Sequence, residues 1–360
     1  MWHDKLKEAG VSIHVIATGG GAGLQEQLWA IPGSSAYLSG ASFPYAMEEH
    51  DELLGFKPDK YCSPEDAVDL ASAAYMKAYR FGGKKPVGVG ITASVASEKM
   101  HRGPHHVHVV VMTDTKVLAL NMSLDKGVGV EQRRLDGGLC DDAGFYLTLI
   151  ALDLAGDIKL AYEDATSLAY ERFWSHPYFT ASGQRLAKLE VDNHALLPGA
   201  FNPPHEGHFG MAHEVEKIGR QVVFAATVNP PHKDSLSVQD CLKRAKLLHG
   251  HNRLFTHDDP LFIDKARAYP RTPMIIGADA CQRLFDPKWG TDIEKSLEEF
   301  KNLGTKFYVS DRIVDGVLLK GWDVVASMPT HLYGKYSQLF CSIAGSWNIS
   351  STELRNKLNK

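Results

Sequence analysis

Apolar runs and helix-like segments alternate along the first half of the chain. Short apolar runs bounded by turn residues predict buried strands at residues 11–17, 87–91 and 107–112. Residues 24–30 and 67–80 have the composition of helices. Ser63 followed by Pro64 and two acidic residues is typical of a capped helix start, so we expect the second helix to begin there.

The second half repeats this alternation in the order that a parallel sheet requires. Apolar strands are predicted at residues 195–197, 221–226, 274–276 and 307–310. Helical segments are predicted at residues 209–218 and 238–248, and another helix after residue 349. A strand, a helix and a second strand of this kind form a parallel β-α-β unit. We therefore expect two α/β domains, the second with a parallel sheet.

The stretch between the two halves differs in character from both. Residues 158–174 are amphipathic and rich in acidic and aromatic side chains, and turn residues follow them. Because no internal repeat or low-complexity tract appears, two different domains are the simplest interpretation. We predict an N-terminal domain at residues 1–157, a helical connector at 158–192 and a C-terminal domain at 193–360.

The composition, 44% hydrophobic and 23% charged, is normal for a soluble globular protein. A formal net charge of -4 gives no basic bias, which argues against a general nucleic-acid binder. The five cysteines are scattered without a C-x-x-C pair, which indicates a reducing compartment. No apolar run reaches the ~18 residues of a membrane span, and the N-terminus lacks the pattern of a signal peptide. We expect a cytoplasmic homo-oligomer that binds neither nucleic acid nor membrane.

A glycine run follows the first predicted strand. Residues 19–23 read Gly-Gly-Gly-Ala-Gly, and a helix is predicted directly after them. A strand, a glycine turn and a helix start can hold a phosphate through backbone N–H groups. The run lacks the G-K-[ST] of a P-loop and the G-x-G-x-x-G register, so glycines that only permit a tight turn explain it equally well.

Four histidines lie within eight residues, at His101, His105, His106 and His108. Their density raises a metal hypothesis, but no cysteine or carboxylate pattern accompanies them in this stretch. Strand alternation puts His106 and His108 on one face, where core or pocket-lining histidines are the simpler interpretation. We therefore predict no protein-bound metal.

Two histidines three residues apart follow the first strand of the second half. His205 and His208 come after a turn rich in glycine and proline, at the start of a predicted helix. Their spacing puts both imidazoles on one face, beside the unpaired N–H groups and the positive end of the helix dipole. This arrangement predicts an anion site, with phosphate as the first candidate. It is not the zinc-protease H-E-x-x-H motif, which needs the second histidine at i+4.

Further polar residues follow other predicted strands of this half. Lys233 ends a turn after the second strand, and Asp279 follows the third at the edge where parallel sheets bind ligands. Residues 350–355 put three hydroxyls and Arg355 at a helix start, a combination that suits a polyphosphate. Each has a purely structural alternative: a solvated cation, a helix cap or an ordinary Ser/Thr-capped terminal helix.

Two signatures give the second half a family resemblance. Residues 199–208 resemble the G-x-F-x-P-x-H-x-G-H signature of the nucleotidylyltransferase superfamily. Residues 349–355 resemble the I-S-S-T-x-x-R signature of its nicotinamide/nicotinate mononucleotide adenylyltransferase branch. The resemblance covers about residues 194–360 and implies a Rossmann-like domain. Ala200 departs from the usual Ser or Thr, which affects at most one hydrogen bond to phosphate.

The resemblance implies adenylyl transfer from ATP to a pyridine mononucleotide, giving NAD or deamido-NAD and pyrophosphate, with Mg²⁺ entering alongside ATP. It implies catalytic roles for His205, His208, Lys233 and Arg355. It implies that ATP is bound by Gly199, Ala200, Phe201, Ser350, Ser351 and Thr352. It implies that Asp279 and Trp289 bind the mononucleotide. Transfer to another phosphate, such as phosphopantetheine, is the nearest enzymatic alternative.

The first half resembles the CinA C-terminal family, whose better-known members are nicotinamide mononucleotide amidohydrolases. Residues 18–20 resemble the end of the family's E-S-C-T-G-G loop, residues 31–35 its V-P-G-S-S, and residues 45–50 its Y-S-N-E-A-K. In this register the family's nucleophilic serine falls on Ile16 and its lysine on His50. Isoleucine cannot attack an amide, and histidine differs from lysine in charge and reach.

Three interpretations of the first half follow. We favour an inactive amidohydrolase relative kept as a nucleotide-binding or dimerising module. The alternatives are a hydrolase that uses Thr18, Ser34 or Ser35 with His50, which would make the protein bifunctional, and a purely structural domain. The whole chain could also be a nucleotide-binding regulator. The candidate pocket residues of this half are Thr18, Gly19, Gly20, Ser34, Ser35, Tyr45 and His50.

Overall fold

A computed structural model describes residues 2–82, 85–190, 193–230, 234–286, 292–314, 316–347, 349 and 351–358, the last range with only the backbone of residues 352, 357 and 358. The contacts divide the chain into two compact units. Unit 1 comprises Met1–His176, Gln184–Ala187 and Ser237–Lys246. Unit 2 comprises Pro177–Gly183, Lys188–Leu236 and Leu247–Lys360.

Unit 1 is built on a mixed sheet with the strand order β2-β1-β3-β4-β5-β6. Strand β1 runs parallel to β2 and β3, and the following neighbours are antiparallel. The strands are β1 (Ser12–Thr18), β2 (Leu38–Ser42), β3 (Pro86–Ser94), β4 (His105–Met112), β5 (Val117–Leu124) and β6 (Glu163–Asp164). The helices are α1 (Trp2–Ala9), α2 (Leu24–Trp29), the 3₁₀ turn η1 (Ser34–Ala36), α3 (Met47–Leu54), α4 (Pro64–Gly82), α5 (Gly129–Ala151) and α6 (Thr166–Ser175).

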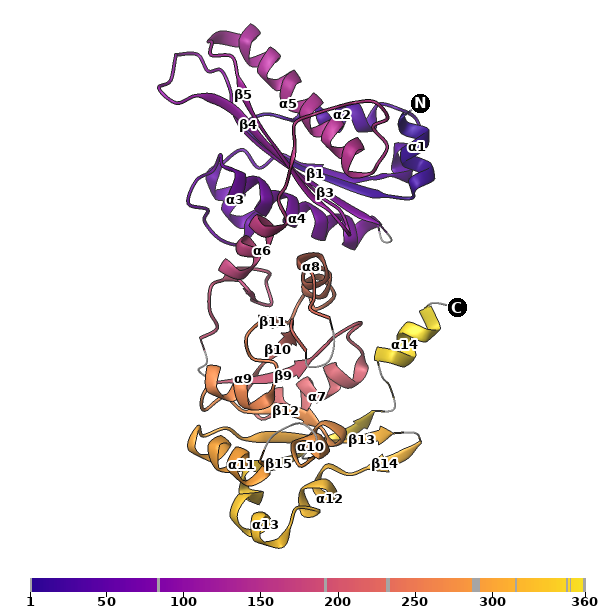
Figure 1. The fold of residues 1–360 in the computed structure, drawn as a ribbon, viewed down its shortest axis with the longest axis vertical. Coiled ribbons are helices and arrows are strands. Elements are labelled where there is room, and N and C mark those ends of the chain that lie inside the picture. Colours follow the sequence, from indigo (N-terminus) through magenta and orange to yellow (C-terminus); the bar gives the residue numbers. More distant parts are fainter. Residues whose placement is uncertain are drawn as a thin grey trace. The chain divides into compact units, whose positions relative to one another are not determined.

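Helices cover both faces of this sheet (Figure 1). Alternate residues of β1, β3 and β4 pack into one large core with α2 and α5. On the other face Ile16 packs against Leu54, Leu70 and Ala74 of α3 and α4. Because both faces are covered, the strands are apolar almost throughout, which is the reason that their sequences read as continuous apolar runs.

Helix α4 lies very close to β3, and two glycines make that approach possible. A Cβ atom on Gly88 would lie 2.2 Å from the Ala71 carbonyl oxygen and 2.3 Å from the Tyr75 backbone nitrogen. A Cβ atom on Gly90 would lie similarly close to the backbone of Ala67 and Ala71. The helix begins as predicted, since the Ser63 hydroxyl accepts the backbone N–H of Asp66 at 3.2 Å.

Two later segments of the chain complete unit 1. Arg185, in β8 (Arg185–Leu186), is buried and lies 3.7 Å from Asp69 of α4, which also accepts from Arg172 at 2.6 Å. In α8 (Val238–Leu247) the Gln239 side chain donates to the Thr113 carbonyl at 3.1 Å. The region predicted as a helical connector thus contains α6 and short strands, and its Arg185 is an ion-pair partner of α4.

Unit 2 contains the parallel sheet predicted for the second half. Along it the strands follow the order β14-β13-β12-β9-β10-β11-β7, and β15 also pairs with β13. The strands β9, β10, β11, β12 and β13 are parallel, whereas β7 and β14 join antiparallel. Their bounds are β7 (Tyr178–Phe179), β9 (His194–Gly199), β10 (Gln221–Thr227), β11 (Asn252–Thr256), β12 (Met274–Gly277), β13 (Phe307–Val314), β14 (Val317–Leu319) and β15 (Phe340–Trp347).

The helices of unit 2 connect these strands. They are α7 (Glu206–Glu216), α9 (Phe262–Ala268), α10 (Ala278–Leu284), α11 (Ile293–Asn302), α12 (Gly321–Ala326), α13 (Thr330–Tyr336), the 3₁₀ turn η3 (Ser337–Leu339) and α14 (Ser351–Leu358). Strand β9 has β10 on one side and β12 on the other, so the strand order reverses between β9 and β12. Ligands of open parallel sheets bind outside the carboxyl ends of the strands at such a switch point. The α/β prediction is confirmed, and the switch point locates the site.

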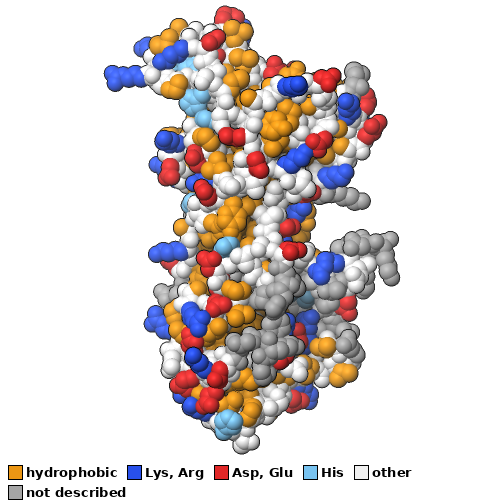
Figure 2. Space-filling view, viewed as in Figure 1, with side chains coloured by type: hydrophobic (Ala, Val, Ile, Leu, Met, Phe, Trp, Pro, Cys, Tyr) orange, Lys and Arg blue, Asp and Glu red, His pale blue; other side chains and the backbone are white. Residues whose placement is uncertain are grey.

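Two surface properties bear on the predicted partners. No helix within the described residues is both long and apolar enough to cross a bilayer. On the face drawn in Figure 2, basic and acidic side chains are interspersed rather than gathered by sign.

The close approach of α4 to β3 gives a stability prediction. Gly88→Val should destabilise the protein by about 2 kcal/mol or more, because the added carbons overlap the α4 backbone, which cannot move as a side chain can. The matched control is Gly138→Ala in α5, where no atom lies within 4 Å and the change should stabilise by about 1 kcal/mol. Thermal unfolding of the full chain measures both. Equal melting temperatures for the two variants would contradict the packing.

Candidate functional site

The turn between β9 and α7 is held in one conformation by packing. Phe201 is fully buried with φ 47°, and its ring lies against the β9 end. A Cβ atom on Gly199 would come within 2.8 Å of that ring, so a larger residue cannot occupy this position without displacing it. The Phe201 ring also meets the His208 ring edge-on at 4.9 Å between centroids. The buried Phe201 ring thus packs against the His208 ring and limits its movement.

The two histidines of the signature lie together at the start of α7. His205 is the N-cap residue and His208 the third residue of the helix, and their rings stack with 3.7 Å between centroids. The backbone N–H of His205 donates to Nδ1 of His208 at 3.2 Å. Because Nδ1 accepts this bond, the neutral His208 ring carries its proton on Nε2. The prediction that both imidazoles share one face is confirmed.

The environment keeps both rings uncharged. Burial is the main reason that the pKa of His208 is lowered to about 3, and the neighbouring His205 and Arg312 contribute to the same shift. Burial also lowers the pKa of His205. The positive charge of Arg312 adds to this shift, whereas the negative charge of Glu353 opposes it. Nδ1 of His205 is buried without a hydrogen-bond partner among the described residues. The pair therefore presents polar N–H donors rather than fixed positive charges.

The second signature reaches the first through α14. The Ser351 hydroxyl donates to the carbonyl oxygen of Pro203 at 2.9 Å, and the Arg355 guanidinium donates to that of Asn202. The first turn of α14 therefore lies directly on the turn that precedes His205. Some 148 residues separate Ser351 from Pro203 in the chain, so only the fold brings them together.

Three charged side chains flank this site: Asp279, Arg283 and Arg312. Arg312 lies close enough to lower the pKa of both histidines. Its Nε lies 3.6 Å from Oδ1 of Asp279, and Arg283 donates to Oδ2 of the same carboxylate at 3.2 Å. Asp279, a predicted site residue, is therefore paired with two arginines. Sequence reasoning missed Arg283, whose i+4 spacing from Asp279 was the available signal.

A cavity of about 420 Å³ opens beside this turn. Gly199 and Ala200 line it from the turn, Arg283 from α10 and Lys265 from α9. Lys265 is 1% exposed and donates to the backbone carbonyl of Asp259. Burial lowers the pKa of Lys265 to about 8, although Asp259 and Asp264 pull it upward. No sequence signal distinguishes this lysine from a solvated one.

Several predicted site residues fall outside the described residues. They are Lys233, Trp289, Ser350 and the side chain of Thr352. The roles given to them stay predictions. Of the others in this half, the structure brings together Gly199, Ala200, Phe201, His205, His208, Ser351 and Arg355 at one edge of the sheet.

Comparisons with known proteins agree with this geometry. The cytidylyltransferase-like family matches residues 196–357. The "Probable nicotinate-nucleotide adenylyltransferase" of Bacillus pumilus is 30% identical to this chain. The match covers 67% of the length of that protein and 31% of this chain. The chain belongs to this nucleotidyltransferase family. The protein of the same name from Borrelia turicatae is 26% identical, and the match covers 46% of this chain and 85% of the length of that protein. The predicted resemblance of residues 194–360 is confirmed.

The nucleotidyltransferase match does not extend over the whole of every relative. The chain spans 63% of the length of the relative from Bacillus cytotoxicus, which is 32% identical and has the same name.

Solved structures of the CinA superfamily are similar to the N-terminal half. They include the "competence/damage inducible protein CihA from Agrobacterium tumefaciens", at 18% identity and a TM-score of 0.33 over 42% of this chain and 90% of that one. A CinA superfamily protein from Enterobacter cloacae has 13% identity and a TM-score of 0.34 over 42% and 90%.

The glycine loop of unit 1 is closely packed. A Cβ atom on Gly19 would lie 1.9 Å from the Ala93 carbonyl oxygen, and one on Gly20 would lie 2.8 Å from Sγ of Cys140. Thr18 ends β1 directly before them, opposite Thr92 of β3. These glycines permit close packing of the turn, which supports the structural alternative given above.

The candidate hydrolytic residues of unit 1 are held in other contacts. Ile16 is fully buried, and His50 Nε2 lies 2.7 Å from Oδ1 of the buried Asp66. Ser34 and Ser35 belong to η1, and neither makes a side-chain hydrogen bond within the described part of the chain. Tyr45 is 61% exposed and accepts a hydrogen bond from Arg133. The structure thus does not join the serines, Tyr45 and His50 through any contact it describes.

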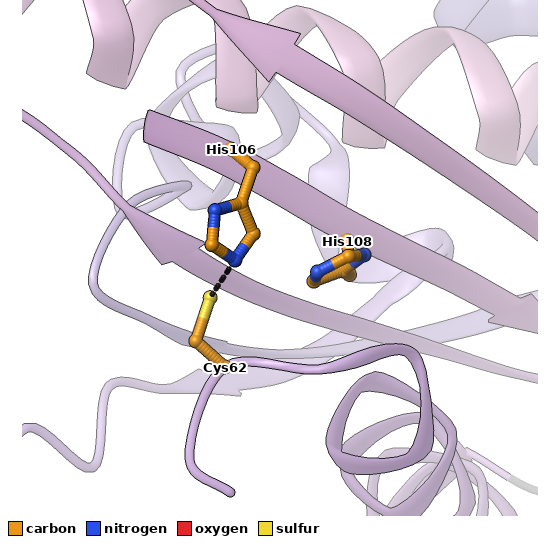
Figure 3. A group of neighbouring side chains, drawn as sticks. All are labelled: Cys62, His106 and His108. Atoms are coloured by element: carbon orange, nitrogen blue, oxygen red, sulfur yellow. Dashed lines mark hydrogen bonds between the residues drawn. The ribbon is translucent and has the colours of Figure 1, made fainter. Parts of the chain in front are cut away.

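The histidine cluster does have a cysteine and a carboxylate beside it, which corrects the sequence analysis. His105 faces one side of the sheet, where its Nδ1 lies 3.4 Å from the buried Asp136. His106 and His108 share the other side, as alternation predicts, with 4.9 Å between ring centroids. There Cys62 lies 3.3 Å from Nε2 of His106 (Figure 3). This cysteine is 44 residues away in the chain, so the pattern of the histidine stretch could not include it.

The His208 environment predicts its protonation state. In ¹⁵N spectra of histidine-labelled protein, with His208→Gln for assignment, His208 should carry its proton on Nε2 and stay neutral from pH 8 to about pH 4. Since its pKa is about 3 in the folded protein and 6.5 for an unperturbed histidine, unfolding takes up a proton between these values. This contribution to stability is complete above pH 6.5 and is lost as the pH falls toward 3. Titration of His208 between pH 5 and 7 would contradict the assignment.

Proposed function

We propose that this protein transfers the adenylyl group of ATP to the 5′-phosphate of nicotinate mononucleotide, with nicotinamide mononucleotide as the alternative acceptor. A phosphate oxygen of the mononucleotide attacks the α-phosphorus of ATP, the bond from that phosphorus to the β-phosphate oxygen breaks, and pyrophosphate leaves. The product is deamido-NAD, or NAD for the amide. ATP enters as its magnesium complex. The relatives named above, which are called nicotinate-nucleotide adenylyltransferases, favour the acid as acceptor.

The contact of α14 with the turn before α7 carries this proposal. Ser351 and Arg355 bind the carbonyl oxygens of Pro203 and Asn202, which places a hydroxyl, a guanidinium and two imidazoles around one turn. Such a set of donors suits a chain of phosphates. A mononucleotide phosphate needs little help from a general base near neutral pH, so positioning and charge stabilisation supply the catalysis.

His208 would stabilise the charge that develops on the α-phosphate. Its tautomer leaves an N–H donor on Nε2, and its low pKa means that this donor is a neutral imidazole at physiological pH. A donor fixed before the reaction needs no reorganisation when charge develops, which makes it effective in the transition state. His205, stacked on it, would bind a neighbouring phosphate oxygen. Arg312 and Arg355 would supply the positive charge.

The cavity beside Gly199 and Ala200 is the proposed acceptor site. It lies at the carboxyl ends of the parallel strands, where the order of the sheet reverses. Arg283 and the buried Lys265 give it two cationic residues. An acidic ring substituent or a phosphate would be favoured there over a neutral group, which agrees with nicotinate mononucleotide as the acceptor.

His208→Ala should lower the turnover of adenylyl transfer by about 10² to 10³, the usual effect of losing one donor to a transition-state oxyanion. Pyrophosphate release and dinucleotide formation from Mg-ATP and each mononucleotide measure it. The control is His213→Ala, an exposed position in the last turn of the same helix, which should retain activity. Near-normal turnover in His208→Ala would contradict the mechanism. Failure of the wild type with both mononucleotides would favour a nucleotide-binding regulator.

For unit 1 we favour a module that does not hydrolyse its ligand. The protein should release no ammonia from nicotinamide mononucleotide when ATP is absent, because Ile16 is part of an apolar core and His50 is bound to Asp66. An ammonia assay on the wild type and on His208→Ala separates this from the chemistry of unit 2. Ammonia release that disappears in His50→Ala would instead establish a bifunctional deamidase.

A further inference from the structure

Three potential metal ligands meet on the α4 side of the unit 1 sheet. They are Cys62, from the loop that leads into α4, and His106 and His108, which are alternate residues of β4 (Figure 3). One ligand atom from each lies within 4.8 Å of the other two, and all three side chains are half-buried. No step proposed above uses any of them.

Hydrogen bonds prepare both imidazoles to bind a cation. Nδ1 of His106 lies 3.1 Å from the Pro104 carbonyl oxygen, which can only accept, so this nitrogen carries the proton. Nδ1 of His108 lies 2.6 Å from Oδ1 of Asn121. The Asn121 amide nitrogen donates to the Glu163 carboxylate at 2.7 Å, which fixes the amide so that its oxygen faces His108. Both neutral rings thus keep a lone pair on Nε2, as metal-binding histidines do.

The cysteine is held in place by its neighbours on both sides. Thr92 of β3 donates to the Tyr61 carbonyl oxygen at 2.6 Å, which ties the loop to the sheet immediately before Cys62. Ser63, immediately after it, caps α4 through the backbone N–H of Asp66. The loop therefore delivers Sγ to the histidines without help from a ligand.

We propose that Cys62, His106 and His108 form a binding site for one zinc-like divalent cation. A tetrahedral zinc ion, at about 2.3 Å from sulfur and about 2.0 Å from nitrogen, separates those two ligand atoms by about 3.5 Å. Sγ of Cys62 and Nε2 of His106 are already 3.3 Å apart. The ligand atom of His108 lies within 4.8 Å of both, so this ring would turn toward the ion to complete the set. Three protein ligands leave a fourth position for water or an exogenous ligand.

The donor set decides the class of cation. One sulfur and two imidazoles suit zinc and related transition metals, whereas magnesium and calcium require oxygen ligands. The alternative is a thiol nucleophile, Cys62, with His106 as its base. That pair needs no second imidazole, whereas His108, oriented by Asn121 and Glu163, matches a third metal ligand. The metal would also link the loop before α4 to β4, in addition to the bond by which Thr92 ties that loop to β3.

Metal content and spectroscopy of the full-length protein test this site. After removal of metals with EDTA, the wild type should retain one Zn²⁺ per chain on dialysis against buffered zinc. With Co²⁺ it should show the absorption of a tetrahedral site together with a thiolate charge-transfer band. Cys62→Ser should abolish the charge-transfer band, and Asn121→Ala should weaken zinc binding about 10- to 100-fold by freeing the His108 ring. Neither readout depends on adenylyl transfer.

Matched controls separate this site from incidental binding. Cys341→Ser, in unit 2, and His101→Asn, on the other side of the strand, should bind zinc as the wild type does. Circular dichroism confirms that each variant is folded. Substoichiometric zinc in the wild type, or unchanged binding by a folded Cys62→Ser, would overturn the proposal. Iodoacetamide that modifies Cys62 equally fast with and without Zn²⁺ would also overturn it and leave the thiol–imidazole pair.

Discussion

The candidate site of unit 2 depends on the hydrogen bond from the His205 backbone N–H to Nδ1 of His208. A helix start leaves its first N–H groups without partners inside the helix, and this bond satisfies one of them. It also fixes the His208 ring in one tautomer and holds it against His205 at stacking distance. The Phe201 ring packs edge-on against the His208 ring. The same hydrogen bond therefore caps the helix and fixes the tautomer of His208.

This dependence explains which parts of the site the sequence could predict. Local patterns can be recognised in a single sequence. They include the spacing of His205 and His208, the glycine and proline of the turn, and the hydroxyls of the last helix. The meeting of Ser351 with Pro203 is not local, and only the resemblance to a family predicted it. Arg312 and Lys265 carry no local pattern. Their place follows from strand order and burial, which a single sequence does not specify.

The same distinction holds in unit 1. Alternation along β4 predicted that His106 and His108 share a face, and the capping pattern predicted where α4 begins. Their combination was not predictable. Gly88 and Gly90 let the backbone of α4 lie close on β3, and the Thr92 bond to Tyr61 ties the loop before α4 to the same strand, so that Cys62 lies beside the histidines. The sequence identifies these glycines as strand residues but not the helix that packs on them.

His208 and the strand histidines His106 and His108 use opposite tautomers, and the hydrogen-bond partner of Nδ1 decides which. At the helix start the available backbone group is an N–H donor, so Nδ1 of His208 accepts and Nε2 keeps a proton that can be offered to an anion. On the strand the available groups are the Pro104 carbonyl and the Asn121 amide oxygen, so Nδ1 donates and Nε2 keeps a lone pair that can be offered to a cation. Histidine alone therefore does not predict the charge of a ligand. The partner of Nδ1 does, and for His108 that partner is a side chain of the neighbouring strand β5, which the sequence around His108 does not specify.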